Sequence, residues 1–137
     1  MTQGTEYLSQ LGANSKIPQH VDEAELERIP NQWANANYDV SLECHEFTCI
    51  CPVTSQPDFA EIYIDYTPDE WLVESKSLKL YLGSFRNMGI FHEFVVNRIC
   101  DDLVKLLKPK WIEVRGEFSV RGGIRIVPVA RWSQKNN

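Results

Sequence analysis

The stretch FAEIYIDY, residues 59–66, sets the fold class of this 137-residue chain. Ile62 and Ile64 alternate with Glu61 and Asp65, so apolar and charged side chains point in opposite directions if the segment is extended. A period of two is typical of a strand with one face against a core. The segment therefore predicts a half-buried strand, and the neighbouring patterns decide what packs against it.

Two helical patterns follow that strand. In SLKLYLGSFRN, residues 77–87, Leu78, Tyr81, Leu82 and Phe85 fall on one stripe at 100° per residue. A second helix is predicted from Phe91 to Leu107, and Pro109 ends it. Its predicted buried face consists of Phe91, Phe94, Val95, Ile99, Leu103 and Leu106.

Further strand patterns lie on both sides: YDVSLECHEF at 38–47, KWIEVRGEFSV at 110–120 and GIRIVPVARW at 123–132. The order strand-strand-helix-helix-strand-strand predicts an α+β fold, an antiparallel four-stranded sheet with two helices on one face. Such a sheet has two open edges, which a neighbouring subunit can cover, so we expect a ring-like homo-oligomer. Residues 1–37 are predicted to form an extended arm with a short helical turn at DEAELERI, and residues 38–137 a single domain.

The net charge of -5 argues against a nucleic-acid backbone as the main partner, because that binding needs a basic surface. No apolar run approaches the roughly 20 residues that cross a bilayer, and the N-terminus lacks the apolar core of a secretory signal. We therefore expect a cytoplasmic protein without a membrane partner, whose four cysteines are reduced thiols.

The stretch FTCICPVTSQPDFA, residues 47–60, carries two of these cysteines and is predicted to form a loop, because prolines withhold ladder donors. Cys44, His45, Cys49 and Cys51 resemble metal ligands, but the C-x-C spacing is too tight for the usual zinc knuckle. Cys51 is instead a candidate nucleophile. Asp58 on the same stretch could exchange its proton, provided that the carboxyl is buried. The competing interpretation is a loop cysteine beside a capping aspartate.

Two further groups of residues are candidates for ligand binding. Lys76, Lys79 and Arg86 share one helix sector with Gly83, which would leave the backbone uncovered for phosphate groups; a solvated lysine face is the alternative. In FHE, residues 91–93, Glu93 could accept two hydrogen bonds from a guanine-like ring and His92 could carry a proton near neutral pH. The alternative is a first-turn Glu that only complements the helix dipole.

Four motifs stand in the order and spacing of a known family: EFTCICPVTSQPDFA, VESKSLKLY, SFRNMGIFHE and RGGI. The chain resembles, over residues 38–127, the single-domain NADPH-dependent 7-cyano-7-deazaguanine reductases, the nitrile reductases of queuosine biosynthesis. The resemblance implies the tunnelling fold of GTP cyclohydrolase I, with active sites between subunits. It also implies reduction of the nitrile to the primary amine through a covalent cysteine thioimide, with two NADPH per turnover and no metal.

The resemblance assigns roles by position. Cys51 matches the nucleophile and Asp58 the proton donor. Substrate-binding positions match Val73, Glu74, Ser75, His92 and Glu93. Lys76 and Lys79 would face the phosphates of the cofactor, joined by Arg121 if a partner subunit presents it.

Three other functions stay open. An amidine-forming relative acts on the same nitrile in tRNA, but such proteins lack the intact cofactor motif. A zinc-dependent cyclohydrolase would need Cys and His ligands around an open position. A purine-binding oligomer without turnover would keep Glu93 but would not need Cys51 and Asp58.

Overall fold

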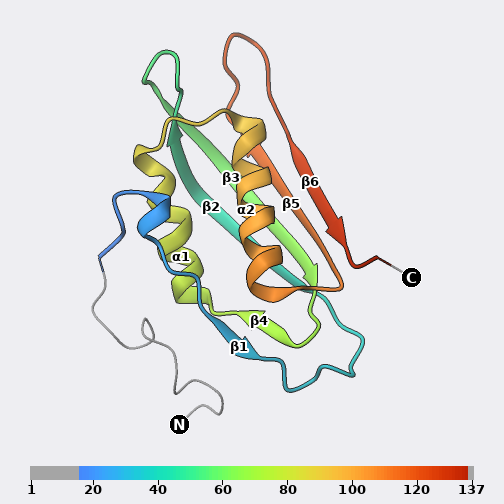
Figure 1. Ribbon diagram of the computed structural model, residues 1–137. Helices are drawn as coiled ribbons and strands as arrows, with labels where there is room; N and C mark the ends of the chain where they lie inside the picture. Colours follow the sequence, from blue (N-terminus) through green and yellow to red (C-terminus); the bar gives the residue numbers. More distant parts are fainter. Residues whose placement is uncertain (1–15, 136–137) are drawn as a thin grey trace.

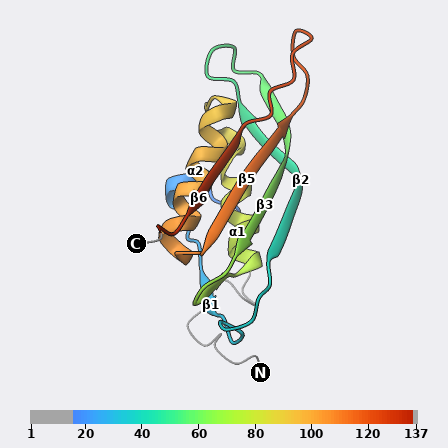
Figure 2. The same cartoon turned by 90° about the vertical axis from the view of Figure 1, so that its right-hand side faces the viewer.

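The computed structural model describes residues 16–135, and their main feature is a four-stranded antiparallel sheet with two helices on one face (Figures 1 and 2). The strand order is β2-β3-β5-β6. The strands are β2 (Val40–Ile50), β3 (Pro57–Thr67), β5 (Trp111–Phe118) and β6 (Val129–Ser133), and the helices are α1 (Ser75–Gly83) and α2 (His92–Leu107). The predicted α+β class and antiparallel sheet are confirmed.

A second, two-stranded sheet was not expected from the sequence. In it β1 (Arg28–Pro30) pairs antiparallel with β4 (Trp71–Val73), and the Arg28 guanidinium lies 3.8 Å from the centre of the Trp71 ring. Just before β1, the short 3₁₀ helix η1 (Val21–Glu23) buries Val21 in the core. Three-residue strands are too short to show a periodic pattern. The division into an arm at 1–37 and a domain at 38–137 stays a prediction, and residues 1–15 lie outside the described part.

The stretch 47–60 is mostly strand, so the prediction of a loop over its whole length is wrong. β2 runs through Ile50, and only residues 51–56 form the connection before β3 begins at Pro57. The register of β2 against β3 shifts between Cys44 and Phe47. Such a bulge changes which side chains face inward, and it leaves Phe47 and Cys49 fully buried.

The apolar stripe predicted for the first helix is confirmed: Leu78, Tyr81 and Leu82 on α1 are buried, and so is Phe85 on η2 (Ser84–Asn87). The stripe predicted for α2 is partly wrong. Phe91 and Phe94 are 48% and 60% exposed, and Leu106 is only partly buried. The buried face consists of Val95, Val96, Ile99, Cys100, Leu103 and Leu107. The helix is therefore rotated toward the Val96 side relative to the prediction, which leaves Phe94 at the margin.

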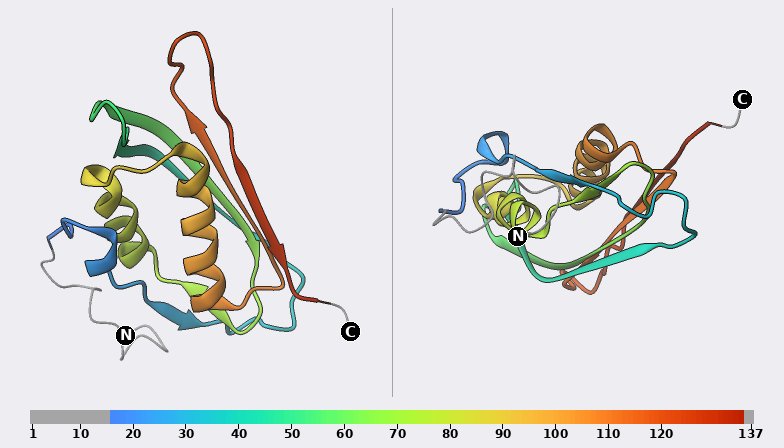
Figure 3. Two further views of the ribbon diagram at one scale, coloured as in Figure 1. Left: turned by 45° about the horizontal axis from the view of Figure 1, so that its top comes forward. Right: turned by 90° about the horizontal axis from the view of Figure 1, so that it is seen from below.

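The topology separates the two ends of the molecule. The connection 51–56, the start of α2 and the long β5–β6 connection lie together at one end, whereas β4 and the start of α1 lie at the other (Figures 1 and 3). The eleven residues of β3 span the distance between the two ends, which is about 33 Å at the usual rise of about 3.3 Å per residue. Within residues 16–135 no helix is long and apolar enough to cross a membrane. The cytoplasmic location stays a prediction.

Candidate active site

Five of the predicted site residues line one cavity of about 290 Å³ at the end of the sheet where β3 begins. Cys51 follows the last residue of β2, Asp58 is the second residue of β3, and Arg121 lies in the β5–β6 connection. His92 and Glu93 open α2. The apolar part of the lining consists of Pro52, Ile90, Phe91, Ile124 and Ile126. Three segments distant in sequence therefore meet at the predicted nucleophile.

Cys51 is held in a tight turn that favours its ionised form. Its backbone N–H donates to the Gln56 carbonyl at 2.8 Å, and the Ser55 N–H donates to the Cys51 carbonyl at 3.0 Å. The hydrogen bond from the Thr54 side chain is the largest influence lowering the pKa of the Cys51 thiol, and the backbone N–H groups of Thr54 and Val53 act in the same direction. The negative charge of Asp58 opposes them, but the net direction is down. A thiol with a lowered pKa is the reactive kind.

The other cysteine of the pair has the opposite environment. Cys49 is fully buried in β2, and burial, followed by the nearby Asp58, raises the pKa of its thiol to about 12. Cys100 is also buried, and its pKa is raised to about 11. Cys44 is partly buried against the core. Only Cys51, among the four, combines a lowered pKa with partial exposure to a cavity.

Asp58 is buried, with 3% of its surface exposed, as its predicted role requires. Its two oxygens have different partners: Oδ1 lies 2.6 Å from Arg121 Nε, and Oδ2 lies 3.2 Å from His92 Nε2. A buried carboxylate is costly unless it is paired and hydrogen-bonded. These two partners fix the orientation of the carboxylate at the cavity wall.

His92 is positioned by an aromatic neighbour that sequence reasoning missed. Its ring stacks on Phe118 with 3.9 Å between ring centres and 5° between planes, and its side chain is 13% exposed. The other ring nitrogen, Nδ1, is buried without a hydrogen-bond partner among the described residues. Phe118 ends β5, 26 residues after His92, so only the packing of α2 on the sheet brings them together. Glu93, next in sequence, is exposed to the cavity in the first turn of α2.

The remaining predicted residues lie on or just before α1, away from this cavity. Val73 is buried in β4 opposite Arg28, and Glu74 caps α1 by accepting hydrogen bonds from the N–H groups of Lys76 and Ser77, both at 2.8 Å. The two oxygens of the Glu74 carboxylate are thus engaged in the cap. The structure of one chain does not bring these residues to Cys51.

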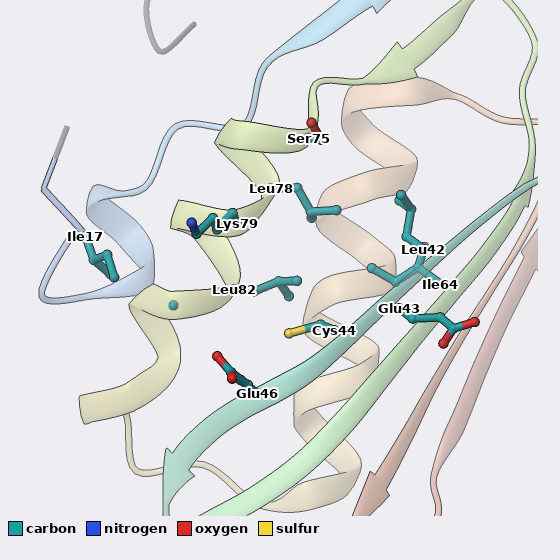
Figure 4. Close-up of a pocket in the computed structure, with 11 residues that line it drawn as sticks. Ile17, Leu42, Glu43, Cys44, Glu46, Ile64, Ser75, Leu78, Lys79 and Leu82 are labelled. Atoms are coloured by element: carbon teal, nitrogen blue, oxygen red, sulfur yellow. The ribbon is translucent and has the colours of Figure 1, made fainter. Parts of the chain in front are cut away.

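Ser75 and Lys79 line a different cavity, a groove of about 380 Å³ between α1 and β2 (Figure 4). Its floor is apolar, and Glu46 adds a carboxylate, whereas the Glu43 side chain points away from α1 and its carboxylate lies 3.0 Å from His45 Nε2 (Figure 4). The full lining is Ile17, Leu42, Glu43, Cys44, Glu46, Ile64, Ser75, Leu78, Lys79, Leu82 and Gly83. Lys79 is therefore exposed in a groove of mixed charge.

Two details of the predicted basic stripe are wrong. A Cβ atom at Gly83 would lie 3.1 Å from Ile17 Cγ2, so Ile17 covers the backbone that the sequence suggested was open. Arg86 does not extend along the stripe, because its Nη1 donates to the carbonyls of Pro18 at 2.7 Å and Gly83 at 3.0 Å. The N-terminal segment 16–18, which carries no motif, thus occupies part of this face.

No three His, Cys, Asp or Glu side chains of residues 16–135 are grouped so that they could hold a metal ion. The expected absence of a metal requirement stays a prediction that metal analysis of the purified protein can test.

Comparisons with known proteins identify relatives of the whole chain. A family model described as QueF-like protein matches residues 57–137. Curated relatives named NADPH-dependent 7-cyano-7-deazaguanine reductase include one from Anaeromyxobacter sp. (strain Fw109-5), 56% identical over 81% of this chain and 91% of its own. Another, from Bacteroides fragilis (strain YCH46), is 52% identical over 98% of this chain and 89% of its own.

A solved structure described as the archaeosine synthase QueF-Like in the apo form is similar in fold. Its TM-score is 0.67 at 20% identity, covering 74% of this chain and 99% of that one. At this identity the likeness concerns the fold alone. The sequence relatives and the family model carry the assignment: the chain belongs to the family of NADPH-dependent 7-cyano-7-deazaguanine reductases, which are oxidoreductases.

Proposed function

We propose that this chain reduces the nitrile of 7-cyano-7-deazaguanine to the primary amine of 7-aminomethyl-7-deazaguanine, a step of queuosine biosynthesis, through a covalent thioimide on Cys51. The main support for the proposal is that Cys51, Asp58 and His92 line the same cavity. The pKa of Cys51 is lowered there, and the buried Asp58 carboxylate is paired with His92. The names of the curated relatives support the substrate and the cofactor.

The first step needs a nucleophile and a proton. The Cys51 thiolate attacks the nitrile carbon, a C–S bond forms, and one π-electron pair of the nitrile moves to the nitrogen. That nitrogen takes a proton from the Asp58 and His92 pair, whose Oδ2 and Nε2 lie 3.2 Å apart, within reach of proton exchange. The product is a neutral thioimide, covalently attached to Cys51.

Reduction then takes two hydrides, because converting a nitrile to an amine needs four electrons. NADPH, when bound, supplies each hydride, so two molecules are consumed in succession. After the first hydride reaches the thioimide carbon, the electron pair on nitrogen re-forms the C=N bond, the C–S bond breaks and Cys51 leaves as a thiolate. The imine that remains must be kept from water until the second hydride arrives. The apolar lining of the cavity, with Ile90, Phe91 and Ile124, suits that requirement. When the second hydride adds to the imine carbon, the nitrogen takes a second proton from the Asp58 and His92 pair and the amine forms.

Glu93 and His92 are suited to recognise the ring system. The Glu93 carboxylate is exposed to the cavity at the N-terminal end of α2, where the helix dipole stabilises its charge. A carboxylate can accept two parallel hydrogen bonds from adjacent N–H groups of a guanine-like ring. His92 lines the same cavity and is a second side chain that a bound ring could contact.

Lys76 and Lys79 are the residues proposed to hold the phosphates of NADPH. They lie three positions apart on α1, so they share one face of the helix. Lys79 is exposed in the groove that Ser75 also lines, and this donor set fits phosphate groups. The Glu46 carboxylate in the same groove would oppose phosphates, so the phosphates would have to lie on the α1 side of it.

A second copy of the chain is proposed to complete each site. The Cys51 cavity and the groove lined by Ser75 and Lys79 share no residue, although the resemblance assigns both to one substrate and one cofactor. The sheet order leaves β2 and β6 as edge strands, and such edges favour pairing with a neighbour. A homo-oligomer with sites at its interfaces would bring one copy's Cys51 to another copy's α1.

The direct test follows the absorbance of NADPH after 7-cyano-7-deazaguanine is added. We expect substrate-dependent oxidation of two NADPH per nitrile consumed. Absence of oxidation by the purified, metal-free protein would contradict the proposal. Stoichiometric zinc in the elemental analysis would favour the cyclohydrolase alternative, and reaction of the nitrile only within tRNA would favour the amidine-forming one.

A further inference from the structure

We propose that Arg121 is a positioning residue of the reaction, which holds the Asp58 carboxylate of the Asp58 and His92 pair within its own chain, rather than a ligand of the cofactor phosphates. This inference rests on the proposed function, since it concerns the same site. By resemblance Arg121 was expected to face NADPH from a partner subunit. The contacts of its side chain indicate a different role.

All three guanidinium nitrogens of Arg121 are engaged by the segment that leads into β3. Nε lies 2.6 Å from Asp58 Oδ1, Nη1 donates to Gln56 Oε1 at 2.6 Å, and Nη2 donates to the Pro57 carbonyl. The planar, forked guanidinium of Arg121 thus contacts three consecutive residues at once, a geometry that the single ammonium group of Lys cannot reproduce. To bind a phosphate in this conformation, Arg121 would have to release these contacts.

The backbone that carries Arg121 is built for this placement. Arg121 and Ile124 exchange two N–H to carbonyl hydrogen bonds, both 3.0 Å, around Gly122 and Gly123. These glycines have φ of 58° and 79°, a region that glycine adopts at the lowest cost, although a side chain at either position would have room. The tight turn therefore places Arg121 above the start of β3, 63 residues away from Asp58 in sequence.

The contact has two consequences for the chemistry. It fixes one oxygen of Asp58, while His92 Nε2 takes the other, so the carboxyl faces the cavity in a single orientation. It also offsets the negative charge of Asp58, which otherwise disfavours the thiolate of Cys51. Arg121 acts through Asp58 in both cases and need not touch the substrate or the cofactor.

Two variants separate geometry from charge. Arg121→Lys keeps the positive charge but cannot reach three acceptors, whereas Arg121→Gln removes the charge. Arg125→Lys is the matched control, because Arg125 lies in the same connection. Within residues 16–135 its one ion pair is with Glu117, at 2.6 Å. Thermal melting of each variant checks that the fold is retained.

Three measurements are made on each purified protein. The first is the rate of adduct formation with 7-cyano-7-deazaguanine in the absence of NADPH. The second is the KM for NADPH. The third is the pH dependence of iodoacetamide alkylation, which peptide mass spectrometry assigns to Cys51. For Arg121→Lys we expect adduct formation to slow by about tenfold or more, because misplaced catalytic groups lose rate steeply. We expect its KM for NADPH to stay within about twofold of the wild type, since binding of the cofactor is untouched.

For Arg121→Gln we expect the midpoint of Cys51 alkylation to move up by about half a pH unit or more, because the charge of Asp58 is left uncompensated. Arg125→Lys should match the wild type in all three measurements. A raised KM for NADPH in both Arg121 variants, with adduct rate and alkylation midpoint unchanged, would overturn the inference and make Arg121 a phosphate ligand. If the wild type forms no adduct, the proposed function fails, while the alkylation midpoint still decides whether Arg121 offsets the charge of Asp58.

Discussion

At the scale of single residues, the environment of each thiol decides which cysteine can react. Cys49 and Cys51 are two positions apart, yet burial raises the pKa of one and the turn 51–56 lowers the pKa of the other. Thr54 makes the largest contribution to that lowering. The lowered pKa of Cys51 is therefore due mainly to a hydroxyl in its own loop.

Thr54→Val tests this dependence, because it keeps the branched shape and removes the hydroxyl. We expect the pKa of Cys51 to rise, so that alkylation at neutral pH slows and its midpoint moves to higher pH. The sign follows from the lost hydrogen bond, which stabilises the thiolate more than the thiol. Thr48→Val, in the adjoining strand, is the control and should leave the midpoint in place; an unchanged midpoint in Thr54→Val would refute the role of this hydroxyl.

The sequence was sufficient to select Cys51, Asp58, His92 and Glu93 as candidates, and the structure brings these four to one cavity. It could not predict that Asp58 meets Arg121 or that His92 stacks on Phe118. The first contact depends on β5 pairing with β3, and the second on α2 packing against β5. Neither can be read from the spacing of residues along the chain. The sequence therefore predicted residues that share the cavity, but it did not predict the contacts that orient Asp58 and His92.

At the scale of elements, periodicity identified the long helices and strands but not how far α2 is rotated about its axis. Phe91 and Phe94 are apolar and fit the expected stripe, yet both are exposed near the cavity end. Sequence periodicity gives the width of an apolar face, whereas its exact orientation depends on the groove that the sheet offers. The strands β1 and β4 were missed for another reason, since three residues carry too little pattern.

Leu103→Ala and Phe94→Ala together test the orientation of α2. Leu103 is fully buried, so we expect its truncation to lower the free energy of unfolding by about 2–5 kcal/mol. For the exposed Phe94 we expect a loss below about 1 kcal/mol. Both values follow from urea denaturation monitored by circular dichroism. A larger loss for Phe94→Ala than for Leu103→Ala would mean that α2 packs as the sequence pattern first suggested.

At the scale of the whole molecule, the residues expected to form one site are divided between two ends of one chain. Cys51, Asp58, His92, Glu93 and Arg121 lie at one end, whereas β4 and the start of α1, with Val73, Glu74 and Ser75, lie at the other (Figure 1). This division is the argument for a site shared between copies.

Complementation between two inactive variants tests the shared site. Cys51→Ala lacks the nucleophile, and Lys76→Ala combined with Lys79→Ala lacks the proposed phosphate ligands. If each site takes one part from each copy, mixed oligomers formed by co-expression should regain part of the NADPH oxidation that either variant alone has lost. A mixture as inactive as its components, with mixed oligomers verified by mass spectrometry, would place the whole site in one chain.

The central claim is that Cys51 forms the covalent link to the nitrile. It is tested most directly by the intact mass of the protein after incubation with 7-cyano-7-deazaguanine in the absence of NADPH. We expect the wild type and Cys49→Ala to gain the mass of one substrate molecule per chain, and Cys51→Ala to gain nothing and to show no substrate-dependent NADPH oxidation. An adduct that persists in Cys51→Ala, or that maps to Cys49 in the wild type, would contradict this account.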